Sequence, residues 1–340
     1  MIWLTWRQAR AQTLAAGAAL VVVAIYLVFI GLGIRDFYDT NIVGCTGDAC
    51  SQAEELFGEK YLDSVTLIGA LLIAVPGMIG VFWGAPLITR ELEAGTHRLV
   101  WNQSVTRTRW LAVKFGLLAL FSLILTGLFS LLLTWAAEPF DKVVGSRFSS
   151  LTFDSRDLVP LSYAVFGFVL GTTVGLLIRR TLPAMALTLA VFAAAMIVMP
   201  LAVRPHLMSP LTKSVAFTSE VAEKIHGLGS HSDGNGEPEA QTPVGIFDGY
   251  NIPGAWILSS EFTPLIKADG SSFTRADMKT CETGEFRKDI ACLAAQNVHF
   301  DLTYHPASRY WPFQWIEAAI FLTLALLMAA FSFWRLPRLG

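Results

Sequence analysis

"VTLIGALLIAVPGMIGVFWGAPLIT", from Val65 to Thr89, contains no charged side chain. A helix rises about 1.5 Å per residue, so about 20 apolar residues cross the hydrocarbon core of a bilayer, which is about 30 Å thick. A segment in lipid can pair all of its own backbone amides and carbonyls only as a helix. The stretch therefore predicts a transmembrane helix.

Five further stretches are long and apolar enough to cross a bilayer, at residues 11–33, 111–137, 158–178, 182–203 and 313–334. The chain as a whole is 54% hydrophobic and 15% charged, whereas soluble domains carry about 25% charged residues. The first stretch is expected to remain as an uncleaved anchor, because its apolar core is longer than that of a signal peptide. We predict six spans.

Basic residues gather in four of the segments that flank these spans. They are Arg7 and Arg10; Arg90, Arg98, Arg107, Arg109 and Lys114; Arg179 and Arg180; and Arg335 and Arg338. The segments in between differ, and residues 35–63 hold seven acidic and two basic side chains. Basic residues of short loops stay on the cytoplasmic side. The pattern predicts a multi-pass plasma-membrane protein with both termini in the cytoplasm.

The predicted fold class is an all-α transmembrane domain of six helices with a small α+β extracytoplasmic domain between the fifth and sixth spans. Residues 1–203 hold the first five spans and a cytoplasmic loop at 89–110, residues 204–312 form the outer domain, and residues 313–340 form the last span and tail. Within the outer domain, "AWILSSEFT" and "VHFDLTYHPASRYW" alternate as strands do, and "LTKSVAFTSEVAEKIHG", residues 211–227, is expected to be helical.

All four cysteines, Cys45, Cys50, Cys281 and Cys292, lie in segments predicted to be outside. Disulfides persist outside the cytosol, so local pairing of Cys45 with Cys50 and of Cys281 with Cys292 is expected. Four free thiols remain an alternative. A metal site is a weaker interpretation, because no C-x-x-C spacing occurs.

The sequence lacks the motifs of several classes of function. No G-x-x-x-x-G-K-[ST] motif is present to hold a nucleotide, and neither G-x-S-x-G nor H-E-x-x-H occurs. Five of the six histidines lie in the predicted outer domain but without ligand-like spacing, so no metal is predicted. No basic stripe suggests nucleic-acid binding. The chain is predicted to be no enzyme and to hold no cofactor itself.

The predicted cytoplasmic loop, "RELEAGTHRLVWNQSVTRTRWLAVK" from Arg90 to Lys114, is basic and favours helix. It divides into two helical pieces, because Gly95 permits a bend and Thr96 can cap the second piece. Thr106 can likewise cap the third span. The loop is either a solvated connector or a docking surface for a cytoplasmic partner.

This loop resembles that of ABC transporter permeases of the type-2 exporter family, in its actinobacterial-like members. The matching residues are Arg90, Glu91, Glu93, Gly95, Thr96, Arg98, Leu99, Thr106, Arg107 and Lys114. Ser104 departs from the family, which often has proline there. "HPASRYWPFQWIE", from His305 to Glu317, also resembles a motif that precedes the last span in such proteins.

The resemblance implies a permease that works with a separate ABC ATPase subunit, which binds ATP and Mg, and with a second copy or homologue of itself. It places the coupling helix in the loop, at Arg90, Glu91, Glu93, Gly95, Thr96, His97 and Arg98. Rocking of the spans would then move cargo outward, with Pro76 and Pro200 as sites of interrupted helix bonding.

Two residues that are charged at neutral pH fall within the predicted spans, Glu317 and Lys114. Glu317 has either a role in translocation or an interfacial position, paired with Arg309 or near water. Lys114 is expected to extend to the cytoplasmic surface.

The apolar spans favour an amphipathic or hydrophobic cargo such as a drug, a lipid or a peptide-like molecule. Two alternatives stay open: a membrane-bound sensor or scaffold whose outer domain binds a ligand and whose loop docks a partner, and a membrane enzyme that acts through the outer domain.

Overall fold

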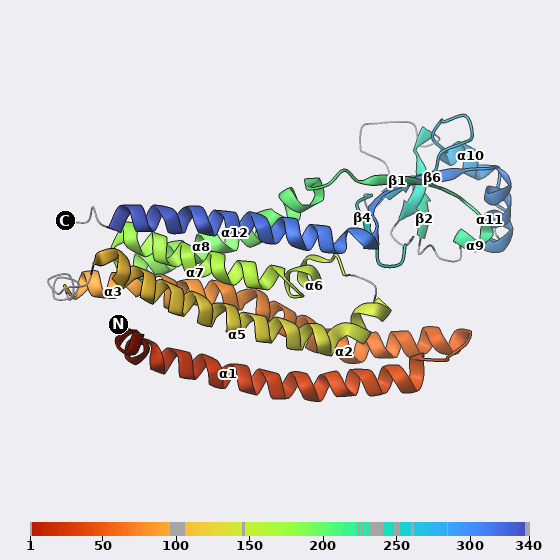
Figure 1. Cartoon of the computed structure of the whole chain (residues 1–340). Helices are drawn as coiled ribbons and strands as arrows, with labels where there is room; N and C mark the ends of the chain where they lie inside the picture. The colour runs from red at the N-terminus through yellow and green to blue at the C-terminus, as the bar shows by residue number, and fades with distance from the viewer. Residues whose placement is uncertain are drawn as a thin grey trace. The chain divides into compact units, whose positions relative to one another are not determined.

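The computed structural model describes residues 2–95, 106–144, 147–222, 225, 227–230, 241–247, 250, 252–259, 262–283 and 285–336. The chain divides into two compact units, one formed by Met1–Leu207 and Tyr310–Gly340 and the other by Met208–Arg309. The first unit is a bundle of long helices (Figure 1). Within the described residues, six helices are long and apolar enough to cross a membrane, as predicted.

The long helices of the bundle are α1 (Ile2–Phe37), α2 (Asp48–Ile79), α5 (Arg107–Val144), α7 (Val159–Ile178), α8 (Thr181–Val198) and α12 (Tyr310–Arg335). Shorter elements join them: η1 (Tyr38–Ile42), η2 (Gly80–Gly84), α3 (Pro86–Glu93), α6 (Ser150–Asp154), η3 (Met199–Val203) and η4 (Arg204–His206). Several helices extend well beyond the apolar stretches that predict them, because the backbone hydrogen bonding of a helix continues into the more polar residues on either side.

The two prolines that were expected to interrupt helix bonding are associated with π-helical segments. Pro76 lies inside α2, shortly before η2, and Pro200 lies within η3. Proline lacks the amide hydrogen that the α-helical ladder needs, and π turns are one way for a helix to absorb the lost bond.

Helix α7 is the centre of the bundle. In its most apolar window 78% of the residues are buried, compared with 17% in α1 and in α8. Its glycines allow the second span to approach very closely: a Cβ at Gly171 would lie 2.1 Å from the carbonyl oxygen of Gly80, and one at Gly175 would lie 2.6 Å from that of Ala85. Small residues at four-residue spacing are a common basis of helix packing in membranes.

The second unit is a small α+β fold. It contains two antiparallel three-stranded sheets, in the orders β1-β6-β4 and β2-β3-β5. The strands are β1 (Leu211–Ala216), β2 (Gly227–Ser230), β3 (Val244–Phe247), β4 (Trp256–Ile257), β5 (Phe262–Pro264) and β6 (His299–His305). The helices are α9 (Ser219–Ala222), α10 (Arg275–Lys279) and α11 (Phe286–Ala295). The predicted fold class is confirmed.

One prediction for this unit was wrong in part. The segment expected to be helical begins with strand β1, which pairs along its whole length with β6, and among the described residues of the segment only Ser219–Ala222 are helical. Cross-strand pairing with β6 outweighs the local preference. The core of the unit holds Val244, Phe273 and Phe300, each fully buried.

Both expected disulfides are present. Cys45 is bonded to Cys50 beside the start of α2, and Cys281 is bonded to Cys292 of α11 in the second unit. Cys281 belongs to the hydrophobic core of its unit.

Candidate functional site

The bundle has two polar ends. We call the end at which α3 stops and α7 joins α8 the Arg90 end, and the end that holds α6 and η4 the Arg204 end. Of the predicted coupling residues, Arg90, Glu91, Glu93 and Gly95 belong to the first, and Glu317 belongs to the second.

At the Arg90 end, α3 continues the second span and ends at Glu93. Gly95 follows with φ +68°, a conformation that glycine adopts at little cost, so the predicted bend is present. Arg90 is exposed. Thr96, His97 and Arg98 lie outside the described residues.

Glu93 contacts the first turn of α8. Its carboxylate accepts a hydrogen bond of 2.8 Å from the backbone amide of Thr181 and one of 2.6 Å from the hydroxyl of the same residue. The Thr181 hydroxyl also lies 2.9 Å from that of Thr89. Amides of the first turn of a helix have no partner within the helix, so a carboxylate on α3 caps α8.

Glu91 contacts α5 in turn, through an ion pair with Lys114. The side chains of Lys114 and Glu91 are 5% and 14% exposed. Lys114 was expected to extend to the cytoplasmic surface; its ammonium group is buried, paired with Glu91 of the predicted cytoplasmic loop and 4.8 Å from the ring centroid of Trp110. Two successive acidic residues of the loop motif, Glu91 and Glu93, thus bind two different spans.

The start of α5 agrees with the sequence. The hydroxyl oxygen of Thr106 accepts a hydrogen bond of 3.3 Å from the amide of Arg109, as a helix-capping threonine does.

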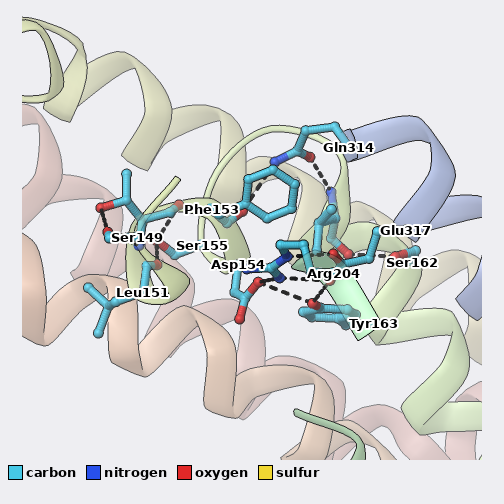
Figure 2. A network of polar contacts seen from close by, with 12 residues as sticks. Ser149, Leu151, Phe153, Asp154, Ser155, Ser162, Tyr163, Arg204, Gln314 and Glu317 are labelled. Atoms are coloured by element: carbon cyan, nitrogen blue, oxygen red, sulfur yellow. Dashed lines mark hydrogen bonds and ion pairs between the residues drawn. The ribbon is translucent and has the colours of Figure 1, made fainter. Parts of the chain in front are cut away.

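At the Arg204 end, three charged side chains form a buried cluster (Figure 2). Arg204 donates from Nε to Glu317 Oε2 at 2.8 Å and from one terminal nitrogen to Glu317 Oε1 at 2.9 Å. The same terminal nitrogen contacts Asp154. The Tyr163 hydroxyl contacts Glu317 and lies 3.2 Å from Asp154 Oδ1. We call Asp154, Tyr163, Arg204 and Glu317 the Arg204 cluster.

The cluster joins four elements and is closed to solvent. The side chains of Arg204, Asp154 and Glu317 are 1%, 6% and 0% exposed, and the guanidinium carbon of Arg204 lies 4.1 Å from the ring centroid of Phe153. The partner considered for an interfacial Glu317 was Arg309 or water, and the structure places Arg204 there instead. The carboxylate pairs with Arg204 and is fully buried.

Burial has a marked effect on Asp154, which lies in α6 between the third and fourth spans. Its removal from water raises the pKa of the carboxyl to about 6, since the opposing effect of Arg204 is partly offset by the negative charge of Glu317.

Gln314 fastens α12 to the same region one turn before Glu317. Its side-chain oxygen accepts from the amides of Leu158 and Val159 at 3.2 and 3.0 Å, and its nitrogen donates to the carbonyl of Phe153 at 3.2 Å. Orphan amides at the start of α7 are satisfied in this way.

The sequence indicated only one member of this cluster. Arg204 directly follows the fifth apolar stretch and Asp154 lies in the connection before the fourth, where charged residues are ordinary, and Tyr163 looks like any aromatic residue of a span. The available signal was Glu317 itself: a carboxylate inside a span requires a cation, and Arg204 is the basic residue that follows the fifth span directly.

An apolar groove of about 400 Å³ lies between the second and fifth spans. It is lined by Ala70, Ile73, Ala74, Gly77, Met78, Val81, Phe82, Leu189, Phe192, Ala193 and Met196. Across the described part of the chain, no group of three or more His, Cys, Asp or Glu side chains is arranged to hold a metal ion.

Comparison with known proteins gave one match. A family model described as "ABC-2 membrane transporter related" matches residues 17–204, which is more than half of the chain. No curated protein and no solved structure matches.

Proposed function

Because the chain belongs to the ABC-2 membrane transporter related family, we propose that it is the permease of an ATP-driven exporter whose energy comes from a separate ATPase subunit. The chain is a multi-pass membrane component of an ABC-2 type transporter. Members of the family are typically permeases without an ATPase domain. ATP and Mg are bound by the partner in this proposal.

The proposed orientation puts the Arg90 end in the cytoplasm with both termini. It is supported by the basic residues that flank the spans at this end, among them Arg90, Arg109, Arg179 and Arg180. The two disulfides also support this orientation, because they fall in segments that would then face the oxidising exterior.

The observation that carries the proposal is the pair of contacts made by α3. An ATPase subunit that grips the loop at exposed Arg90 would move Glu91 and Glu93 with it. Since Glu91 is paired with Lys114 of α5 and Glu93 caps α8 at Thr181, the movement would pass directly to two spans. A solvated connector would need neither contact.

The proposed cargo is amphipathic or hydrophobic. It is supported by the groove between the second and fifth spans, whose lining side chains are all apolar, as binding sites for apolar molecules are. A second permease copy is proposed to face this groove and complete the pathway, with one ATPase subunit for each copy.

A charge reversal at the exposed docking residue tests this function. The full chain is purified from its native membrane, and the proteins that accompany it are identified by mass spectrometry. Arg90→Glu should lower the affinity of the chain for the ATPase subunit by about tenfold, because it replaces an attractive charge with a repulsive one across the interface. The stimulated hydrolysis of ATP should fall in parallel.

Lys142→Glu is the matched control. Lys142 is an exposed basic residue at the end of α5 that belongs to the Arg204 end, so its reversal should change neither binding nor hydrolysis. An ATPase that stays bound and stimulated with Arg90→Glu would contradict the docking role. Cleavage of the segment 96–105 by a protease added outside sealed cells would contradict the orientation.

A further inference from the structure

The Arg204 cluster has an imbalance of charge. Two carboxylates, Asp154 and Glu317, face a single guanidinium, Arg204, and all three are at least nine-tenths buried. If both carboxyl groups were ionised, a net negative charge would be held away from water. An uncompensated buried charge is costly, and such a group usually takes up a proton instead.

The hydrogen bonds lead independently to the same conclusion, that one of the two carboxyl groups is protonated. The Tyr163 hydroxyl is within bonding distance of Asp154 Oδ1 and of Glu317 Oε1, but a phenol has one hydrogen to donate. With both carboxylates ionised, one of these contacts would set two acceptor oxygens against each other. A proton on Asp154, donated to the Tyr163 oxygen, makes both contacts favourable.

We propose that the Arg204 cluster is a proton-binding site, in which Asp154 holds the proton and its release to solvent weakens the junction of α6, α7, η4 and α12. The inference goes beyond the proposed transport function and does not depend on it, because it concerns the stability of the bundle.

Of the two carboxyl groups, Asp154 is the one whose ionised form receives fewer hydrogen bonds from Arg204. Glu317 accepts two hydrogen bonds from Arg204, through Nε and through a terminal nitrogen, whereas Asp154 is contacted by the terminal nitrogen alone. The raised pKa of Asp154 agrees with this assignment.

The titratable groups around Asp154 leave the balance of two carboxyl groups against one guanidinium unchanged. Arg204 of η4, Glu317 of α12 and Tyr163 of α7 are the titratable groups that act on it. On α2, Gly69 lies close to the side chains of Leu151 and Ser155.

The charged neighbours of the cluster have partners of their own. Arg156 pairs with Asp141 of α5 at 3.0 Å, and Asp157 accepts from the Tyr310 hydroxyl at 2.7 Å. His206, the other ionisable group of η4, bonds its ring nitrogen to the carbonyl of Ala202.

The test measures the thermal unfolding midpoint of the full chain in detergent between about pH 5 and about pH 8. A proton that is bound more tightly in the folded state stabilises it at low pH, and this stability is lost as the pH rises through the raised pKa. The wild-type midpoint should therefore fall, by about 3–6 °C for an effect of this size.

Asp154→Asn should remove this fall, because one carboxylate then faces one arginine and no proton is needed. Glu317→Gln should remove it for the same reason, and it serves as the second variant if the first does not fold. Asp157→Asn is the matched control: it removes a carboxylate at the same end that lies outside the cluster and accepts from the Tyr310 hydroxyl, so it should leave the pH dependence in place.

Three results would overturn the proposal. One is a wild-type midpoint that does not fall over this range. The second is a fall of unchanged size in Asp154→Asn or in Glu317→Gln, which would assign the titration to groups outside the cluster. The third is loss of the pH dependence in Asp157→Asn.

Discussion

The carboxylate of Glu93 at the end of α3 caps the first turn of α8 by accepting from the amide and the hydroxyl of Thr181, at 2.8 and 2.6 Å. The two residues are separated by two complete spans in the sequence. A single side chain thus connects the loop that is proposed to meet the ATPase with the span that borders the apolar groove.

Glu93→Ala should separate docking from response. The ATPase subunit should still copurify, because Arg90 is intact, but its stimulated hydrolysis should fall several-fold, since movement of α3 no longer reaches α8. Both quantities are measured on the same preparation.

Thr181→Val tests the other partner of this contact. It keeps the hydrogen bond from the backbone amide to Glu93 and removes the one from the hydroxyl. It should produce a smaller loss than Glu93→Ala, and the double variant should be no worse than Glu93→Ala alone. Losses that multiply in the double variant would show that the two residues act independently.

The buried pair of Lys114 and Glu91 predicts a second pattern of variants. Lys114→Met should lower the free energy of unfolding by about 3 kcal/mol or more, because it removes one partner of a buried ion pair. Adding Glu91→Gln should restore most of that stability. Denaturant or thermal unfolding in detergent measures both effects.

The exposed pair of Lys142 and Glu138 is the control for this experiment. It has the same chemistry, but its side chains are 61% and 55% exposed, so Lys142→Met should cost less than about 1 kcal/mol. Equal losses in Lys114→Met and Lys142→Met would contradict the buried position of Lys114.

The glycines of α7 predict the effect of one added methyl group. Gly171→Ala should destabilise the bundle by about 1–3 kcal/mol, because the new Cβ would lie 2.1 Å from the carbonyl oxygen of Gly80 and 2.8 Å from the amide nitrogen of Ala85. These are backbone atoms that cannot rotate away. The unfolding midpoint measures the loss.

Gly116→Ala on α5 is its counterpart, since no heavy atom lies within 4 Å of the added carbon. Alanine favours helix over glycine, so this variant should be neutral or slightly more stable. A neutral Gly171→Ala would mean that α7 and η2 are farther apart than described.

The sequence predicted the number and positions of the spans because length and apolar character suffice to cross a bilayer. It did not predict where the helices end: α5 continues beyond the third apolar stretch to Val144, since hydrogen bonding within a helix does not stop at the membrane surface. The bend at Gly95 and the cap at Thr106 were predictable, because both depend on neighbouring residues only.

Pairing between spans could not be predicted in the same way. Glu317 was evident as a charge within a span, but its partner Arg204 is more than one hundred residues away in the sequence. The pairing of Lys114 with Glu91 could not be predicted either, because hydropathy reports how apolar a segment is and contains no information on which side chains of two helices meet. The tight contact of Gly171 with Gly80 is equally invisible without the packing of the two helices.

The two disulfides predict different consequences when they are removed. Replacing Cys281 and Cys292 by serine should lower the stability of the Met208–Arg309 unit by about 3 kcal/mol, because the bond closes the longer loop and its first sulfur lies in the core. Hydrogen exchange measured by mass spectrometry should therefore rise throughout that unit of the full chain.

Replacing Cys45 and Cys50 by serine is the matched comparison, and it opens a bond with a sequence separation of only 5. Exchange should rise around the start of α2 and stay unchanged in Met208–Arg309. Both predictions presuppose that the wild-type chain, isolated from its native membrane, binds a thiol-specific maleimide only after reduction. Labelling of any of the four cysteines on intact cells before reduction would contradict the two bonds and the oxidising side to which the proposed orientation assigns them.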